Sequence, residues 1–381
     1  MQKMSIEKYI PYGRQNIDED DIKAVVEVLR SDYVTTGPKV NEFEEKVAKY
    51  CGAKYAVAIA NGTAALHAAC MAAGIGKGDE VITTPVTFVA SSNCVLYCGG
   101  TPVFADIDEK TYNIDPDDIE RKITSKTKAI IAVHFAGQPC DMDRINEIAR
   151  RHNLIVIEDA AHALGAEYKG RKIGSISDMT TFSFHPVKHI TTGEGGMILT
   201  NNKDLYEKLI LARTHGITKN PDKMEKCDGG WYYEQISLGY NYRITDFQCA
   251  LGISQMNKLD KFVAERRKIA AKYDKAFEND DRIVTPYQSP EGKSAYHLYV
   301  IKISNRKEMF DKLRAAGIGV IVHYIPVYTQ PYYRHNGYEN TKCVNAEQYY
   351  ECALSLPIYP GLTDEEQQYV IDKVIENCGE I

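Results

Sequence analysis

The sequence predicts an α/β protein whose mostly parallel sheet is followed by a smaller α+β unit. Over the first 200 residues, short apolar runs alternate with segments of helical spacing, a pattern typical of a parallel sheet covered on both faces. After about residue 245, a long helical stretch replaces this alternation. A chain of 381 residues also has room for about two domains. We therefore predict a large domain over 1–250, with an N-terminal arm, and a small C-terminal domain over 251–381.

The elements of the large domain follow from periodicity. Val40, Phe43, Val47 and Tyr50 recur at helical spacing and predict a helix over 39–52. Short apolar runs bounded by polar or glycine-rich turns predict strands over 55–60, 80–85, 102–108, 128–135, 154–160, 181–184 and 196–200. Intervening segments predict helices over 63–74, 115–123 and 141–153.

The remaining residues predict fewer elements. Residues 246–277 have helical spacing throughout, so we expect one long helix there. Apolar runs near 297–303 and 319–325 predict two strands of the small domain. The longest irregular loop is expected over 222–235.

Composition excludes several classes of partner. A net charge of −6 and a pI near 6.0 argue against nucleic acid as a partner. No window approaches about 18 uninterrupted apolar residues, so no membrane span is expected, and the N-terminus does not resemble a signal peptide. We therefore expect a cytoplasmic protein. The ten cysteines show no zinc-type spacing, so we expect buried free thiols and no metal site.

A single lysine stands between two predicted core strands. Lys188 lies in the turn SFHPVKHITTGEGG, which joins the strands over 181–184 and 196–200. Lysine is almost never fully buried without a partner. Taken alone, Lys188 is compatible with an ordinary exposed turn.

Other chemical groups follow strands of the same predicted sheet, whose carboxyl ends are where ligands bind in α/β folds. The strand over 55–60 runs into Asn61-Gly62-Thr63 and a helix start, which suits a phosphate but equally an ordinary helix cap. Asp159 ends another strand and is followed by His162. Taken alone, Asp159 is compatible with a helix cap and His162 with a core histidine.

Together these groups match the needs of pyridoxal phosphate. The cofactor requires a lysine for a Schiff base and proton transfer, and an acid to keep its ring nitrogen protonated. Lys188 and Asp159 supply these groups. The turn over 61–64 and Ser183 are suited to the phosphate, and Phe88, just after a strand, supplies an aromatic ring for one face of the cofactor.

The chain also resembles the DegT/DnrJ/EryC1/StrS aminotransferases of nucleotide-linked keto sugars. The motifs that carry the resemblance are NGTAALH, PVTFVA, EDAAHALGA, SFHPVKHITTGEGG and GYNYRITDFQCALG, and it extends from about residue 10 to the C-terminus. It implies the aspartate-aminotransferase fold (fold type I), with a mostly parallel seven-stranded sheet, and a homodimer with active sites at the subunit interface.

The resemblance also assigns roles to individual residues. It implies that Lys188 is the Schiff-base lysine, that Asp159 pairs with the pyridinium nitrogen, and that His162 lies beside the cofactor. The remaining matches are phosphate-binding positions and a ring-stacking position: Thr63, Ala64 and Ser183 for the phosphate, Phe88 for the ring, and Asn241, which would reach the phosphate of the neighbouring subunit.

Within the family, the stretches VHFAGQPCDMD and AGIGVIVHYIPVY are similar to the subgroup that makes UDP-4-amino-4,6-dideoxy-N-acetyl-β-L-altrosamine for pseudaminic acid. This implies amino transfer from L-glutamate, which becomes 2-oxoglutarate, to C4 of a UDP-linked 4-keto-6-deoxy amino sugar. His323, Tyr324 and Tyr328 are candidates for the sugar site, although ordinary interface packing would explain them equally well.

Two other functions remain open at this stage. One is a 4-aminotransferase for another nucleotide sugar, of the bacillosamine, perosamine or 4-amino-arabinose type. The other is a regulatory protein that binds pyridoxal phosphate without turnover. No DNA-binding segment is apparent in the sequence, which disfavours the second function.

Overall fold

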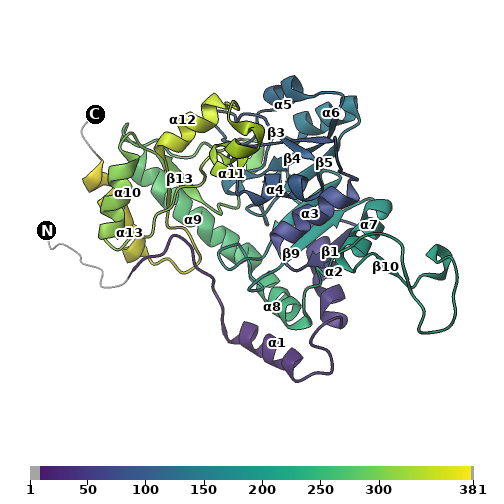
Figure 1. Cartoon of the computed structure of the whole chain (residues 1–381). Coiled ribbons are helices and arrows are strands. Elements are labelled where there is room, and N and C mark those ends of the chain that lie inside the picture. The colour runs from purple at the N-terminus through teal and green to yellow at the C-terminus, as the bar shows by residue number, and fades with distance from the viewer. Residues whose placement is uncertain (1–8, 379–381) are drawn as a thin grey trace.

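The computed structural model describes residues 9–378 and shows a large α/β body beside a smaller α+β unit (Figure 1). Residues 1–8 of the expected N-terminal arm lie outside the described residues. From residue 9, the chain first runs along the small unit, where Ile10 is buried and forms a bridge to Ile318. It then continues to α1 (Glu19–Leu29) and into the large body.

The large body is built on a seven-stranded sheet of order β1-β9-β8-β5-β4-β2-β3. Only β9 runs antiparallel to its neighbours in this sheet; the other pairings are parallel, as the sequence predicts. Its strands are β1 (Tyr55–Ile59), β2 (Glu80–Thr83), β3 (Thr101–Phe104), β4 (Thr127–Val133), β5 (Ile155–Asp159), β8 (Met179–Ser183) and β9 (Gly196–Thr200).

Both faces of this sheet are buried because successive side chains of a strand point to opposite faces. In β1, Val57 and Ile59 pack in one cluster with α3, whereas Ala56 and Ala58 pack in another with α2. The helices that contribute to the two clusters are α2 (Pro38–Cys51), α3 (Gly62–Ala72), α4 (Ala90–Tyr97), α5 (Pro116–Lys122), α6 (Met142–His152), α7 (Lys203–Arg213), α8 (Asp246–Met256) and the first turns of α9 (Leu259–Phe277).

The large body also carries several two-residue strands outside its main sheet. Two of the small strands flank the loop predicted over 222–235, which projects from the body (Figure 1). The short strands are β6 (Glu167–Tyr168), β7 (Arg171–Lys172), β10 (Ile217–Thr218), β11 (Glu234–Gln235) and β12 (Gly292–Lys293).

The small unit packs helices against a two-stranded sheet, β13 (Tyr299–Lys302) and β14 (Ala353–Leu356). This sheet shares a core with Tyr273 and Val374. The helices of this part of the chain are α9 (Leu259–Phe277), α10 (Arg306–Ala315), α11 (Pro331–Tyr333), α12 (Val344–Cys352) and α13 (Asp364–Asn377).

Two predictions for this half of the chain are wrong. The helix expected over 246–277 is two helices, α8 and α9, which are separated at Asn257 and Lys258. The strand expected over 319–325 is absent from the sheets of the described residues; this extended segment forms one isolated bridge, from Ile321 to Ser355. Its neighbouring side chains turn toward a cavity, so no regular ladder forms there.

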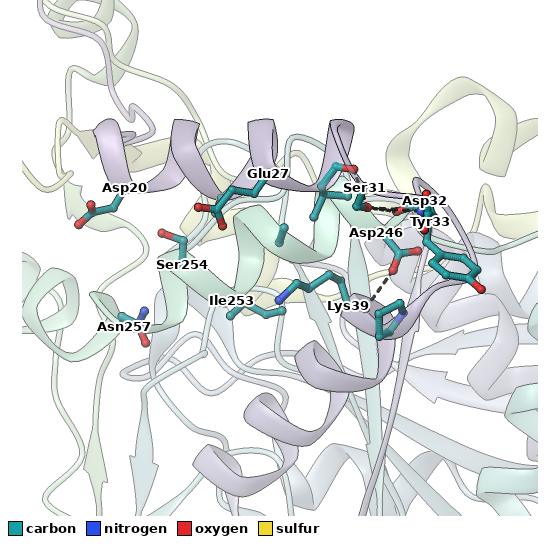
Figure 2. A pocket seen from close by; sticks show the side chains of 14 residues that line it. Asp20, Glu27, Ser31, Asp32, Tyr33, Lys39, Asp246, Ile253, Ser254 and Asn257 are labelled. Atoms are coloured by element: carbon teal, nitrogen blue, oxygen red, sulfur yellow. Dashed lines mark hydrogen bonds between the residues drawn. The ribbon is translucent and has the colours of Figure 1, made fainter.

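A cavity of about 540 Å³ lies between α1, α2 and α8 (Figure 2). Asp246, at the start of α8, accepts hydrogen bonds from the backbone N–H groups of Gly37 (2.8 Å) and Lys39 (2.9 Å). The carboxylate thereby caps the first turn of α2. None of the site residues predicted from the sequence lines this cavity.

Among residues 9–378, no helix has the length and apolar character needed to span a membrane.

Candidate active site

A larger cavity, of about 980 Å³, opens at the carboxyl ends of the parallel strands. Residues 321–324 of the small unit also line it. Its volume lies at the upper end of the range for small-molecule sites. The predicted residues that line it are Thr63, Ala64, Phe88, Asp159, His162, Ser183, Lys188, His323 and Tyr324.

Lys188 occupies the turn between β8 and β9, and its side chain lines the cavity. Burial lowers the pKa of Lys188 to about 8, with a smaller contribution from the Arg266 guanidinium, and the Asp159 carboxylate opposes this shift. An amine with this pKa is partly deprotonated near neutral pH. It is therefore a better nucleophile and proton acceptor than an exposed lysine.

Asp159 is the last residue of β5, and its side chain is 6% exposed. Its Oδ2 accepts a hydrogen bond from Ser91 Oγ at 2.6 Å, and its Oδ1 accepts one from the N–H of Ala161 at 3.2 Å. These two donors hold the carboxylate in place. Since an ionised carboxylate accepts about four hydrogen bonds, Asp159 can still accept one from a cationic ring N–H.

The first turn of α3 and the end of β8 form a narrow polar cradle. A Cβ atom at Gly62 would lie 2.9 Å from the Cβ of Ser183, so glycine is needed for this close approach. Asn61 caps the helix by accepting the N–H of Ala64 at 2.8 Å. The N–H groups of Gly62 and Thr63 donate to no group within residues 9–378. Free N–H groups at the positive end of a helix suit a phosphate.

His162 follows β5 and lines the cavity. Its Nε2 is 3.3 Å from the hydroxyl of Tyr324, whose half-buried side chain also lines the cavity. Burial is the main cause that lowers the pKa of His162, followed by Lys188. The imidazole is therefore neutral at physiological pH.

His323 shares this environment and has a fixed orientation. Its Nδ1 lies 2.8 Å from Ser355 Oγ, and burial, with a smaller effect of Lys188, lowers the pKa of His323 to about 3. The Tyr324 ring packs edge-on against it. These two residues present polar atoms from the small unit to the cavity.

Two predicted residues do not line the cavity. Tyr328 is buried elsewhere, where its hydroxyl donates to Glu347 at 2.6 Å, so the structure does not place it in the sugar site. Asn241 is exposed on the surface and bridges to Thr214. Phe88 lines the cavity mouth with a ring that is 60% exposed.

The structure adds residues that periodicity and motifs did not single out. Ser91 supports Asp159, Tyr12 lines the cavity from the N-terminal segment, and His297 lies 3.3 Å from the amine of Lys188. His297 is 109 positions from Lys188. Its position in an apolar run was consistent with a core strand residue, so no local signal linked it to the lysine.

These groups fit pyridoxal phosphate. Lys188 provides an amine of lowered pKa, Asp159 a buried carboxylate, and the cradle at Gly62 and Ser183 an anion site. The cavity is also large enough for a second ligand beside the cofactor.

Comparison with known proteins agrees with this chemistry. The model of the DegT/DnrJ/EryC1/StrS aminotransferase family matches residues 15–375. The chain is 44% identical over 374 residues to the spore coat polysaccharide biosynthesis protein SpsC of Bacillus subtilis, covering 96% of each chain. It is 41% identical over 371 residues to the UDP-4-amino-4,6-dideoxy-N-acetyl-beta-L-altrosamine transaminase of Campylobacter jejuni, covering 95% of this chain and 96% of that one. It is 40% identical over 382 residues to the GDP-perosamine synthase of Caulobacter vibrioides, covering 98% of each.

Solved structures share the fold over nearly the whole chain. PseC of Helicobacter pylori, an aminotransferase of pseudoaminic acid biosynthesis, superposes with a TM-score of 0.91 at 33% identity, over 97% of this chain and 99% of that one. The sugar aminotransferase Spr1654 of Streptococcus pneumoniae in its PLP form gives a TM-score of 0.90 at 32% identity, over 98% and 100% of the two chains.

Proposed function

The chain belongs to the DegT/DnrJ/EryC1/StrS aminotransferase family, and we propose that it transfers the amino group of L-glutamate to C4 of a UDP-linked 4-keto-6-deoxy-N-acetylhexosamine. The product would be UDP-4-amino-4,6-dideoxy-N-acetyl-β-L-altrosamine, a precursor of pseudaminic acid. As a member of this family, the protein is a pyridoxal-phosphate-dependent sugar aminotransferase. The observation that carries the site assignment is the meeting of Lys188, Asp159 and the Gly62 cradle in one cavity.

The residues of this chain have distinct proposed roles. When bound, pyridoxal phosphate supplies an aldehyde that links to amines and a ring that accepts electrons. Lys188 acts first as the amine that holds the cofactor, and then as the group that accepts and returns a proton at Nζ. Asp159 keeps the ring nitrogen protonated, and the N–H groups of Gly62 and Thr63, with Ser183, bind the phosphate.

The absorption spectrum with glutamate alone tests the catalytic part of this proposal. The loaded protein should lose its visible band and form pyridoxamine phosphate, while 2-oxoglutarate accumulates in a one-to-one ratio. A regulatory protein that binds the cofactor without turnover would keep its visible band. That outcome would contradict the proposed amino transfer.

We also propose that the active form is a homodimer with shared active sites. Among the described residues, Lys188 is the one lysine or arginine that lines the cavity. The proposed substrates carry a diphosphate and carboxylates, so a second copy is a natural source of further cations. The projecting segment near Asn241 also exposes Trp231 (75%) and Leu238 (73%). Covering such side chains favours association.

A cytoplasmic location stays a prediction.

Mixing two impaired variants tests the shared site. If Asn241 binds the phosphate of the neighbouring subunit, Lys188→Ala and Asn241→Ala chains should each be strongly impaired. In a mixed dimer, one of the two sites contains both native residues. Random exchange makes half of the dimers mixed, so the mixture should recover about a quarter of wild-type activity. Activity of the mixture no greater than the average of the two variants, despite subunit exchange shown by native mass spectrometry, would contradict the shared site.

The choice of sugar is tested with a pair of epimers. The proposed substrate and its C5 epimer differ in the face of the ring that carries the methyl group. A pocket that discriminates one methyl position contributes about 1–3 kcal/mol, so kcat/KM should favour the proposed substrate by roughly ten- to two-hundred-fold. Equal or better kcat/KM on the epimer would favour a bacillosamine- or perosamine-type enzyme. The identity shared with the GDP-perosamine synthase makes this the second candidate.

A further inference from the structure

Among residues 9–378, His297 is the one side chain within hydrogen-bonding distance and geometry of the Lys188 amine. Its Nε2 lies 3.3 Å from Lys188 Nζ, and its side chain is 5% exposed. This is the one hydrogen-bonding contact of the ring within the described part of the chain, since Nδ1 has no partner there. A buried imidazole whose sole polar contact is the lysine amine contributes little to folding beyond packing. The contact itself therefore calls for an explanation.

The backbone around His297 is fastened to the turn that carries Lys188. His189 Nε2 donates to the carbonyl of Ala295 at 3.0 Å. The buried Arg266 guanidinium donates to the carbonyl of His297 at 3.2 Å and to that of Val187 at 3.4 Å. Arg266 thus connects the residue before the lysine to the histidine. Movement of one segment relative to the other would break these bonds.

Packing also restricts the same segment. Gly137 approaches so closely that a Cβ atom there would lie 2.8 Å from the backbone nitrogen of Tyr296 and 3.0 Å from that of His297. Tyr296 itself adopts a left-handed backbone conformation, with φ of 48°, which is uncommon for a non-glycine residue. Hydrogen bonds and close packing of its backbone therefore hold His297 against Lys188.

We propose that His297 is a positioning residue that accepts a hydrogen bond from the released amine of Lys188 and holds it in place for proton transfer. The inference rests on the proposed role of Lys188. It requires the Nε2 lone pair of a neutral imidazole to face the lysine. Burial is the largest cause that lowers the pKa of His297, with Lys188 next. Since an ammonium group can only donate, the protonated lysine and the neutral histidine form a complementary pair.

Several other groups influence the charge of Lys188. Asp159 raises its pKa and Arg266 lowers it. The remaining titratable groups near the lysine are three buried imidazoles of lowered pKa and one half-buried tyrosine of raised pKa: His162, His189, His323 and Tyr324.

The test is the pH dependence of the reaction of Lys188 with acetic anhydride in the full-length protein freed of cofactor, read from the Lys188 peptide by mass spectrometry. In the wild type, the reaction should rise with pH, with a midpoint near the value of about 8 given above. Loss of the acceptor in His297→Leu destabilises the ammonium form. The midpoint should therefore fall by about one pH unit. His297→Gln, which retains an acceptor, should bring the midpoint most of the way back to the wild-type value.

His189→Gln serves as the matched control, because the glutamine amide retains an N–H that can donate to the carbonyl of Ala295, and His189 forms no hydrogen bond with the lysine amine. Its midpoint should remain that of the wild type. Thermal unfolding establishes that each variant is folded, and if His297→Leu does not fold, His297→Phe replaces it.

In the cofactor-loaded enzyme, His297→Leu should slow the single-turnover reaction with glutamate about ten- to a hundredfold at nearly unchanged KM, with partial rescue by His297→Gln. An unchanged or raised midpoint in His297→Leu, or an equal shift in His189→Gln, would overturn the proposal. Failure of the proposed role of Lys188 would be recognised separately, as activity retained by Lys188→Ala.

Discussion

Replacing Lys188 with alanine should abolish amino transfer. The variant loses both the amine that holds the cofactor and the proton carrier, and a positioned proton carrier alone contributes about 10²–10⁴-fold to a rate. We therefore expect the turnover number to fall at least about a thousandfold. The visible absorption band of the loaded protein should also disappear. Pyridoxamine phosphate should still bind, because the cradle at Gly62 and the Asp159 carboxylate remain.

A matched lysine variant controls for general effects of charge loss. Lys203 lies exposed at the start of α7, remote from the cavity-lining residues. Lys203→Ala should have wild-type activity and spectrum. More than a trace of turnover in Lys188→Ala, under conditions where Lys203→Ala is fully active, would remove Lys188 from its proposed role.

Asp159→Asn should fold normally and lose most of its activity. Asparagine has nearly the same shape, and its Oδ1 can accept the hydrogen bond from the N–H of Ala161 while its Nδ2 donates to the Ser91 hydroxyl. It carries no charge to keep the ring nitrogen protonated. Loss of one preorganised electrostatic group typically costs about 10²–10³-fold in rate. We expect a reduction of that size in the single-turnover reaction with glutamate, measured by stopped-flow absorption.

Ser91→Ala separates the charge of Asp159 from its orientation. This variant removes the Ser91 hydroxyl, which donates a hydrogen bond to Asp159 Oδ2 at 2.6 Å, but keeps the carboxylate. It should therefore lose less activity than Asp159→Asn. Equal losses in the two variants would indicate that the orientation of Asp159, and not its charge, determines the rate.

Much of the large domain was predictable because its signals are local. The apolar runs that form β1, β4 and β5 are bounded by polar turns, and each strand is confirmed within a few residues. Because the sequence places Thr63, Asp159 and Lys188 after strands of one sheet, it also predicted that they would lie close together, and all three line one cavity.

The errors arise where packing decides the outcome. No glycine or proline marks the break at Asn257 between α8 and α9, so periodicity alone predicted one helix. The segment near Ile321 has the pattern of a strand, but its neighbours line the cavity. The regular partner of β13 is instead β14, a strand that was not foreseen.

Side-chain partners distant in sequence were the least predictable part of the site. Tyr328 and Tyr324 share one short aromatic segment, yet Tyr324 lines the cavity whereas Tyr328 turns into the core to meet Glu347. His297 and Ser91 reach Lys188 and Asp159 from other elements. Only the three-dimensional packing of the large and small parts places these residues.

The central claim is amino transfer from glutamate to a nucleotide-linked keto sugar, and isotope transfer tests it most directly. The purified protein, loaded with pyridoxal phosphate, would receive ¹⁵N-labelled L-glutamate and UDP-2-acetamido-2,6-dideoxy-β-L-arabino-hexos-4-ulose, with the product analysed by NMR. We predict ¹⁵N bound at C4 in the L-altro configuration, together with an equal amount of 2-oxoglutarate. Absence of ¹⁵N from this sugar and from a panel of other UDP-, GDP- and dTDP-4-keto sugars would contradict the claim.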